Sequence, residues 1–135
     1  CFNSGPSCDL CDFETNLCKA LHEFNLQAGW VRRNGQSGIG PPYSDHNANE
    51  SAYFLSLSPE MKSSSATLRT NIFLPTDEER ICQIRFHYWV SGTLMVGLQK
   101  DSEDTVKNIW QVSREQQRQW KTNTITINST EKFEV

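Results

Sequence analysis

The sequence predicts an all-β protein, built as an antiparallel β-sandwich or jelly roll. Three observations support this prediction. The stretch 82–92 alternates between apolar and polar residues, which is typical of a strand with one face on a core. About eight short segments rich in β-branched and aromatic residues are separated by turn residues. No segment has a helical pattern long enough to predict a stable helix, so strands have to form the core.

The stretch 82–92 is predicted to be the central strand. Its inward residues are Cys82, Ile84, Phe86, Tyr88 and Val90, and its outward residues are Gln83, Arg85, His87, Trp89 and Ser91. The next alternating segment, 93–100, is expected to pair antiparallel with residues 81–90, because Ser91-Gly92 has the composition of a turn.

Shorter segments predict the other strands. A bridge between Cys11 and Cys18 would close a short loop and fix a first strand near its start. Residues 19–29 are expected to hold a short helical turn at most. Residues 34–51 are rich in turn residues, and loops of this length usually have a function or are held in place. The remaining predicted strands are 30–31, 53–57, 66–74, 106–112, 120–128 and 133–135.

Composition limits the class of protein. The 135 residues suffice for one domain with a core, and we interpret residues 1–10 as a linker or the end of a preceding module and residues 11–135 as the domain. The net charge of −3 argues against a nucleic-acid binder, which would carry a basic patch.

Sequons at Asn49 and Asn128, together with five cysteines, favour an extracellular setting. Asn128 has the opposite parity to the inward isoleucines of its strand, which suits an exposed glycan.

The cysteines are unevenly distributed. Four of the five lie in the first 18 residues. Cys1 either closes a small loop with Cys8 or is the last cysteine of a preceding module. The spacing Cys8-x-x-Cys11 leaves zinc as an alternative, which would need a second pair at a suitable spacing. Because the count is odd, at least one cysteine is expected to be free or to pair outside the chain.

Catalysis is not favoured by the sequence. The histidines are His22, His46 and His87, and neither a nucleophile elbow nor an H-E-x-x-H helix accompanies them. Asp45-His46 permits a catalytic or metal-binding interpretation. We favour turn chemistry instead, with Asp45 capping the turn through an Asx hydrogen bond and His46 packed beside it.

Several motifs occur in an order that is typical of one extracellular family. They are Cys11-Asp12-Phe13-Glu14 with Leu17-Cys18, Trp30, Gly40-Pro41, Asp45-His46, Tyr53, Cys82 with Phe86, Tyr88 and Gly92, Trp110, Trp120 and Phe133-Glu134-Val135. Together they resemble the MAM domain, the module named for meprin, neuropilin and a receptor tyrosine phosphatase. The resemblance covers residues 11–135. It departs from the family at Lys19-Ala20-Leu21, where a tryptophan is usual, at Asn47, where a threonine is usual, and at Ser51-Ala52-Tyr53, where G-x-Y is usual. The family's closing segment, with its acidic pair and last cysteine, has no counterpart in this sequence.

The resemblance implies a fold and a covalent framework. The fold is a jelly-roll sandwich similar to that of legume lectins. Cys11 is expected to pair with Cys18, and Cys82 with the family's last cysteine, which lies outside this chain. We therefore expect the domain to be incomplete at its C-terminus and to be part of a larger glycoprotein that is secreted or membrane-anchored.

The resemblance also implies a function. It is that of a non-catalytic module for adhesion or oligomerisation, which binds a protein partner or a second copy of itself. The alternatives are a carbohydrate-binding jelly roll and a spacer domain in a multi-domain protease or receptor. A structural calcium ion at Glu14 and Asp45 is a further alternative, since calcium takes oxygen ligands. Contact candidates are the outward His87 and Trp89 with the loop 34–51, because aromatic residues are favoured at binding hot spots; Trp89 packed under a loop is the alternative.

Overall fold

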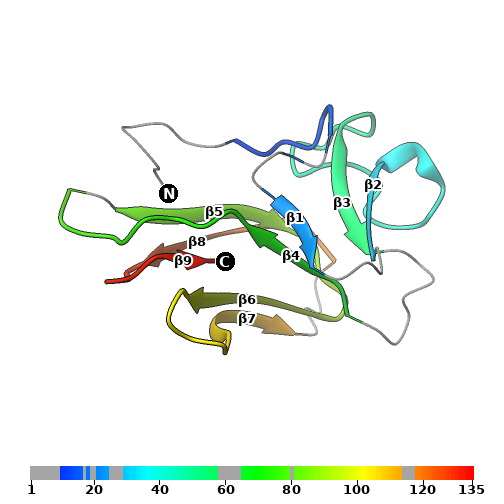
Figure 1. The fold of residues 1–135 in the computed structure, drawn as a ribbon. Coiled ribbons are helices and arrows are strands. Elements are labelled where there is room, and N and C mark those ends of the chain that lie inside the picture. Colours follow the sequence, from blue (N-terminus) through cyan, green and yellow to red (C-terminus); the bar gives the residue numbers. More distant parts are fainter. Residues whose placement is uncertain are drawn as a thin grey trace. The chain divides into compact units, whose positions relative to one another are not determined.

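The computed structural model describes residues 10–16, 18, 21–24, 29–57, 65–79, 81–113 and 118–135. In these residues it contains nine strands and one short 3-10 helix, and the strands pair antiparallel (Figure 1). The prediction of an all-β antiparallel protein is therefore confirmed. The chain divides into two compact units, Leu10–Thr70 and Asn71–Val135. No helix in the described part of the chain has the length and apolar character that crossing a membrane requires.

The first unit holds two antiparallel strand pairs. Its elements are β1 (Leu21–Phe24), β2 (Trp30–Asn34), the 3-10 helix η1 (Gly35–Ser37), β3 (Tyr53–Leu57) and β4 (Thr67–Thr70). β2 and β3 are consecutive and pair as a hairpin with a long connection, whereas β1 and β4 flank that hairpin in the sequence and pair with each other.

The second unit has the same arrangement, in which an inner hairpin is flanked in the sequence by an outer strand pair. Its strands are β5 (Cys82–Tyr88), β6 (Thr93–Lys100), β7 (Lys107–Ser113), β8 (Lys121–Ile127) and β9 (Phe133–Glu134). β6 and β7 form the inner hairpin, and β5 and β8 flank it in the sequence and pair with each other. β9 pairs with the other side of β6. An outer strand pair around an inner hairpin is the way in which a jelly roll is wound.

The core of the second unit is built mainly from inward-facing strand residues. Its buried members are Phe73, Cys82, Leu98, Ile127 and Phe133, with Ile84, Ile109, Ile125 and Val135 packed against them. Phe133 is 1% exposed, and its ring centroid lies 5.6 Å from that of Phe73. Burial along β5 alternates residue by residue, which confirms the predicted period of two.

One predicted pairing is wrong. Residues 93–100 do not pair with residues 81–90, because β6 pairs with β7 and β5 with β8. Phe86 and Tyr88 of β5 instead place their rings edge-on against Trp110 of β7, at centroid distances of 5.1 and 5.2 Å. The connection after β5 therefore carries the chain into a different sheet and does not close a tight hairpin.

The predictions for residues 11–29 need correction. Residues 11–16 contain bends and no strand, and the first strand, β1, lies where a helical turn was expected. Asx-type bonds explain the bends, because they offer the backbone an alternative to a strand ladder. The predicted strand 66–74 is shorter, since β4 ends at Thr70 and Phe73 forms only an isolated bridge with Phe133. The other predicted strands differ from the structure mainly at their ends.

Candidate interaction surface

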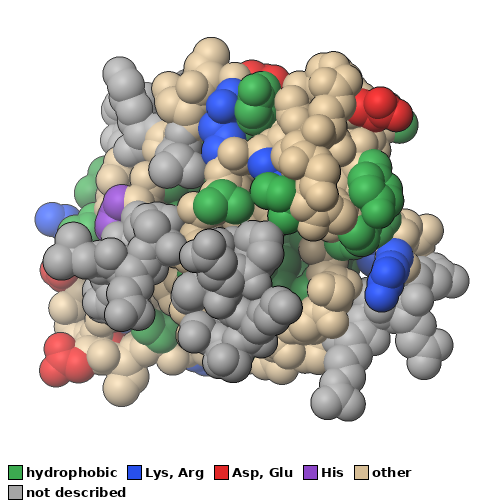
Figure 2. Space-filling view, turned by 90° about the vertical axis from the view of Figure 1, so that its right-hand side faces the viewer, with side chains coloured by type: hydrophobic (Ala, Val, Ile, Leu, Met, Phe, Trp, Pro, Cys, Tyr) green, Lys and Arg blue, Asp and Glu red, His purple; other side chains and the backbone are tan. Residues whose placement is uncertain are grey.

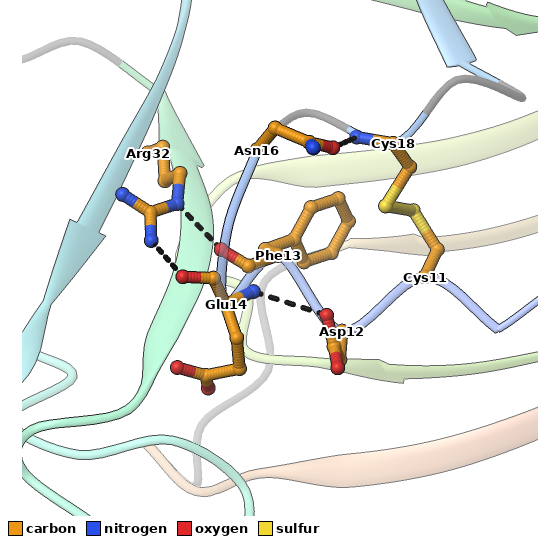
Figure 3. The surroundings of a disulfide bond; sticks show 7 residues. All are labelled: Cys11, Asp12, Phe13, Glu14, Asn16, Cys18 and Arg32. Atoms are coloured by element: carbon orange, nitrogen blue, oxygen red, sulfur yellow. Dashed lines mark hydrogen bonds between the residues drawn. A yellow bond between two sulfur atoms is a disulfide. The ribbon is translucent and has the colours of Figure 1, made fainter.

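The turn closed by the Cys11–Cys18 disulfide is stabilised by its own side chains (Figure 3). The backbone N–H of Glu14 donates to Asp12 Oδ1 over 3.1 Å, and the N–H of Cys18 donates to Asn16 Oδ1 over 2.8 Å. Both are Asx-type bonds that span two residues and fix the local backbone. The pairing of Cys11 with Cys18 that the resemblance implied is confirmed.

Arg32 connects this turn to the β2–β3 hairpin. Its guanidinium group donates to the carbonyl oxygens of Phe13 and Glu14 (Figure 3). The same group lies over the ring of Tyr53, with its carbon 3.4 Å from the ring centroid, in a cation–π arrangement. Glu14 completes the connection, because its carboxylate accepts the backbone N–H of Tyr53 over 3.0 Å.

The connection between β2 and β3, residues 35–52, is here called the β2–β3 loop, and Arg33 lies beneath it. Arg33 is 5% exposed. Its guanidinium group donates to three successive carbonyl oxygens, those of Gly40, Pro41 and Pro42, over 3.3, 3.1 and 3.3 Å. Burial lowers the pKa of Arg33, because desolvation penalises the charged form. These neutral carbonyl groups replace the water that the cation has lost.

Asp45 is the second anchor of the loop. It is 9% exposed, and its Oδ1 accepts the backbone N–H groups of Asn47 and Asn49 over 2.9 and 2.8 Å. Its own N–H donates to the carbonyl oxygen of Asn49 over 3.0 Å. His46 Nδ1 lies 3.9 Å from Asp45 Oδ2. The predicted Asx cap at Asp45 is therefore confirmed, and the Asp45-His46 pair builds a turn.

The loop also closes onto its own beginning. The N–H of Gly35 donates to the carbonyl oxygen of Glu50 over 3.0 Å, and Gln36 Nε2 donates to Ser51 Oγ over 3.3 Å. A Cβ atom placed on Gly35 would lie 1.8 Å from the carbonyl oxygen of Tyr43, so only glycine permits this approach. Bonds within the loop and to Arg33 thus hold both of its ends and its middle.

Two large apolar side chains of this loop are exposed. Tyr43 is 63% exposed and Ile39 is 47% exposed. On the face that Figure 2 shows, hydrophobic side chains form several separate patches among polar ones. The loop is therefore an element with a fixed backbone that presents an aromatic and an aliphatic side chain to solvent.

Sequence reasoning identified the loop but missed Arg33, which holds it. The available signal was the parity of β2, in which Val31 and Arg33 share one face. A charged residue at an inward position of a strand is costly unless it is hydrogen-bonded. It therefore indicates a specific set of acceptors, which here is the G-P-P backbone.

The calcium alternative remains a prediction. The Glu14 carboxylate accepts a bond from the backbone of Tyr53, and the Asp45 carboxylate accepts two bonds from its own turn. Across the described ranges, no group of three His, Cys, Asp or Glu side chains is placed to hold a metal ion. Calcium takes about six to eight oxygen ligands, so these two carboxylates would need several carbonyl or water ligands in addition.

The contact candidates of β5 differ in their accessibility. His87 is exposed on the outward face, as predicted, and its Nδ1 lies 2.7 Å from Oγ1 of Thr122 on β8. Trp89 is only half-buried, and its indole packs edge-on against Trp120 with centroids 6.2 Å apart. Trp89 therefore already packs against an aromatic side chain of its own unit, and both His87 and Trp89 stay predicted contacts.

The outward face of the β5–β8 pair is polar. It consists of Gln83, Arg85 and His87 opposite Thr126, Thr124 and Thr122. The aromatic side chains Phe86 and Tyr88 face the other way, toward Trp110. A lectin-like site would be favoured by aromatic rings on an exposed sheet face, and this face does not present Phe86 or Tyr88.

The remaining cysteine predictions need one further correction. Cys82 is 3% exposed and disulfide-bonded, and its pairing with a cysteine outside this chain stays a prediction. The partner of that bond lies outside the described residues, as do Cys1 and Cys8. A disulfide needs Cα atoms within about 7 Å, and sequence spacing does not determine which distant cysteines meet. The zinc alternative is wrong for Cys11, because this cysteine is oxidised in its disulfide with Cys18 and is not free to bind a metal as a thiolate.

A comparison with protein families agrees with this framework. The family model described as MAM domain, meprin/A5/mu, matches residues 11–135. MAM domains are extracellular jelly-roll sandwiches that mediate protein interactions, often homophilic. They are themselves non-catalytic, although they occur in proteases such as meprin. The resemblance, the fold class and the extracellular setting predicted from the sequence are thereby confirmed. Because the match covers most of the chain, the chain belongs to the MAM domain family.

Proposed function

We propose that this domain is an interaction module that binds a protein partner through the β2–β3 loop, with Tyr43 and Ile39 as its apolar contacts. The observation that supports this proposal is that the Tyr43 side chain is exposed while the backbone that carries it is held in place. Tyr43 is 63% exposed, while Arg33, which holds the backbone on its N-terminal side, is 5% exposed. The first partner to test is a second copy of the same chain, because MAM domains often pair homophilically.

A fixed loop is suited to binding for a physical reason. Association costs free energy when side chains and loops must be ordered, so a loop that is already ordered retains more of its contact energy. Aromatic residues supply much of that contact energy at hot spots. The same loop also carries polar residues, among them Ser44 and Asn47, which suit the polar rim that surrounds the apolar centre of an interface.

Sedimentation of the secreted, disulfide-intact domain tests the homophilic form of the proposal. We expect reversible self-association that is weakened by Tyr43→Ala. Met95→Ala is the matched control, because Met95 is 56% exposed but lies on β6 in the other unit. A monomer at every concentration, or equal weakening by both variants, would contradict homophilic binding through the loop.

Binding of the labelled domain to cell surfaces tests the heterophilic form. Saturable binding that Tyr43→Ala reduces and Met95→Ala leaves unchanged supports a different protein partner. Binding that competing free sugars abolish would support the carbohydrate alternative instead. If the domain neither self-associates nor binds cells, the interaction proposal fails and a spacer role is favoured.

A further inference from the structure

We infer that Asn128 carries an N-linked glycan, and that the first sugar residue of this glycan occupies the cavity beside it. This inference is independent of the partner proposed for the β2–β3 loop. It depends on three features of the second unit, which are the alternation of residues after β8, the hydrogen bonds of Ser129 and the lining of the cavity.

The sequon follows the end of β8 and keeps the alternation of an extended chain. Ile127 is 2% exposed and Ser129 is 4% exposed, whereas Asn128 and Thr130 are both exposed. Neighbouring residues of an extended chain point to opposite sides, so Asn128 and Thr130 share the outer side. A glycan on Asn128 would therefore point away from the core, as expected for a sequon at the surface of a secreted protein.

The middle residue of the sequon holds its backbone in place. The N–H of Thr76 donates to the carbonyl oxygen of Ser129 over 2.8 Å, and the N–H of Ser129 donates to Thr76 Oγ1 over 2.8 Å. Ser129 Oγ in turn donates to the carbonyl oxygen of Glu131 over 2.7 Å. With the backbone of Ser129 fixed from both sides, the direction in which Asn128 leaves the surface is also fixed.

A cavity of about 350 Å³ lies directly beside this side chain. It is lined by Thr76, Asp77, Lys100, Asn128, Ser129 and Thr130. Hydroxyl, carboxylate and ammonium groups of this kind can bond to the hydroxyl groups and the acetamido group of an N-acetylhexosamine. A sugar attached to Asn128 is present at a high effective concentration, so weak contacts in the cavity suffice to place it there.

The second sequon has a different environment. Asn49 Oδ1 accepts the N–H of Ser51, and the hydroxyl oxygen of Ser51 accepts a bond from Gln36. The side chains of both sequon residues thus take part in the folded β2–β3 loop. Asn49 is exposed and stays a predicted glycosylation site, but the argument for a seated sugar concerns Asn128.

The modification itself is a transfer from an activated sugar. The Nδ2 atom of Asn128 forms a bond to the anomeric carbon of a lipid-linked oligosaccharyl pyrophosphate and loses one proton. The bond between the anomeric carbon and the pyrophosphate oxygen breaks, and the lipid pyrophosphate leaves with its electron pair. No oxidation or reduction takes place.

The test of attachment uses the domain secreted from a glycosylating cell. Glycopeptide mass spectrometry is expected to locate a glycan on Asn128, and Thr130→Ala is expected to abolish it while leaving Asn128 itself in place. Asn49→Gln is the control and is expected to leave the Asn128 glycan unchanged. Secreted domain with an unmodified Asn128 would overturn the inference.

The test of placement compares two forms of identical sequence, one trimmed to a single sugar and one made without glycosylation. Slower amide hydrogen exchange at residues 76–77 and 128–130 in the single-sugar form supports a seated sugar. Lys100→Ala is expected to abolish that difference, whereas Lys107→Ala, at an exposed position of β7, is expected to keep it. Equal exchange in both forms would show that the glycan projects into solvent and that the cavity is not its seat.

Discussion

Replacing Arg33 by methionine is expected to destabilise the protein and to loosen the β2–β3 loop. Methionine keeps an unbranched apolar stem but removes the donors that bond to the carbonyl oxygens of Gly40, Pro41 and Pro42. It also removes the cation that lies 4.7 Å from the ring centroid of Phe54. The three carbonyl groups would then need water, or would stay unpaired beside a smaller side chain.

The magnitude follows from the hydrogen bonds and the burial of Arg33. A hydrogen bond to a charged group contributes roughly 1.5–3 kcal/mol. Three of its bonds share Nη1 and a fourth uses Nη2, so we count them as about two good bonds, or ~4 kcal/mol. Burial of the charge opposes this, as the lowered pKa indicates, and methionine relieves that cost. The expected net loss is about 2–3 kcal/mol, a large share of a typical stability of about 5–15 kcal/mol.

Urea unfolding of the disulfide-intact domain measures this loss. Arg85→Met is the matched control, because Arg85 is exposed on β5, and it should change the free energy of unfolding by less than about 0.5 kcal/mol. Arg33→Lys keeps the charge but not the planar fork that reaches successive carbonyl groups, so it should restore only part of the stability. Hydrogen exchange should speed up in residues 35–52 while β5 stays protected. Wild-type stability of either Arg33 variant would refute the reasoning.

Three further perturbations test other parts of the structure. Replacing both Cys11 and Cys18 by serine opens a loop with a sequence separation of 7. The entropy that the unfolded chain regains should lower the free energy of unfolding by about 2.4 kcal/mol, and an unchanged urea midpoint would contradict that account. Gly35→Ala should cost about 1–3 kcal/mol, because the new Cβ would overlap a backbone carbonyl across the loop, whereas Gly92→Ala meets open space and should be nearly neutral in the same titration. Phe133→Ala should cost about 3–5 kcal/mol in calorimetric unfolding, and a loss below about 1 kcal/mol would mean that the core closes over the missing ring.

Much of the local structure could be predicted because it depends on neighbouring residues. The alternation of 82–92 identified β5 and its inward face, and the segment 53–57 coincides with β3. The Asx cap at Asp45 could also be predicted, since an aspartate bonds to backbone groups a few residues on. The exposure of Asn128 followed from the parity of its strand.

The candidate site could be predicted only in part. The turn-rich composition of residues 34–51 indicated a loop with a role, but not which of its side chains reach solvent. That outcome depends on Arg33, which is buried because the loop folds back over it, and on the close approach of Tyr43 to Gly35. The parity of β2 marks Arg33 as an inward residue, but no local pattern indicates which backbone groups of the loop it meets.

By itself, the sequence determined most of the strands, the inward face of β5, the family and the extracellular setting, because alternation and motif order are properties of consecutive residues. Only the tertiary structure decided that β5 pairs with β8 and that a cavity lies beside Asn128. These features join segments that are far apart, as Thr76 and Ser129 are, at a separation of 53 residues. Their geometry follows from the packing of both segments at once, so neither segment alone could have predicted it.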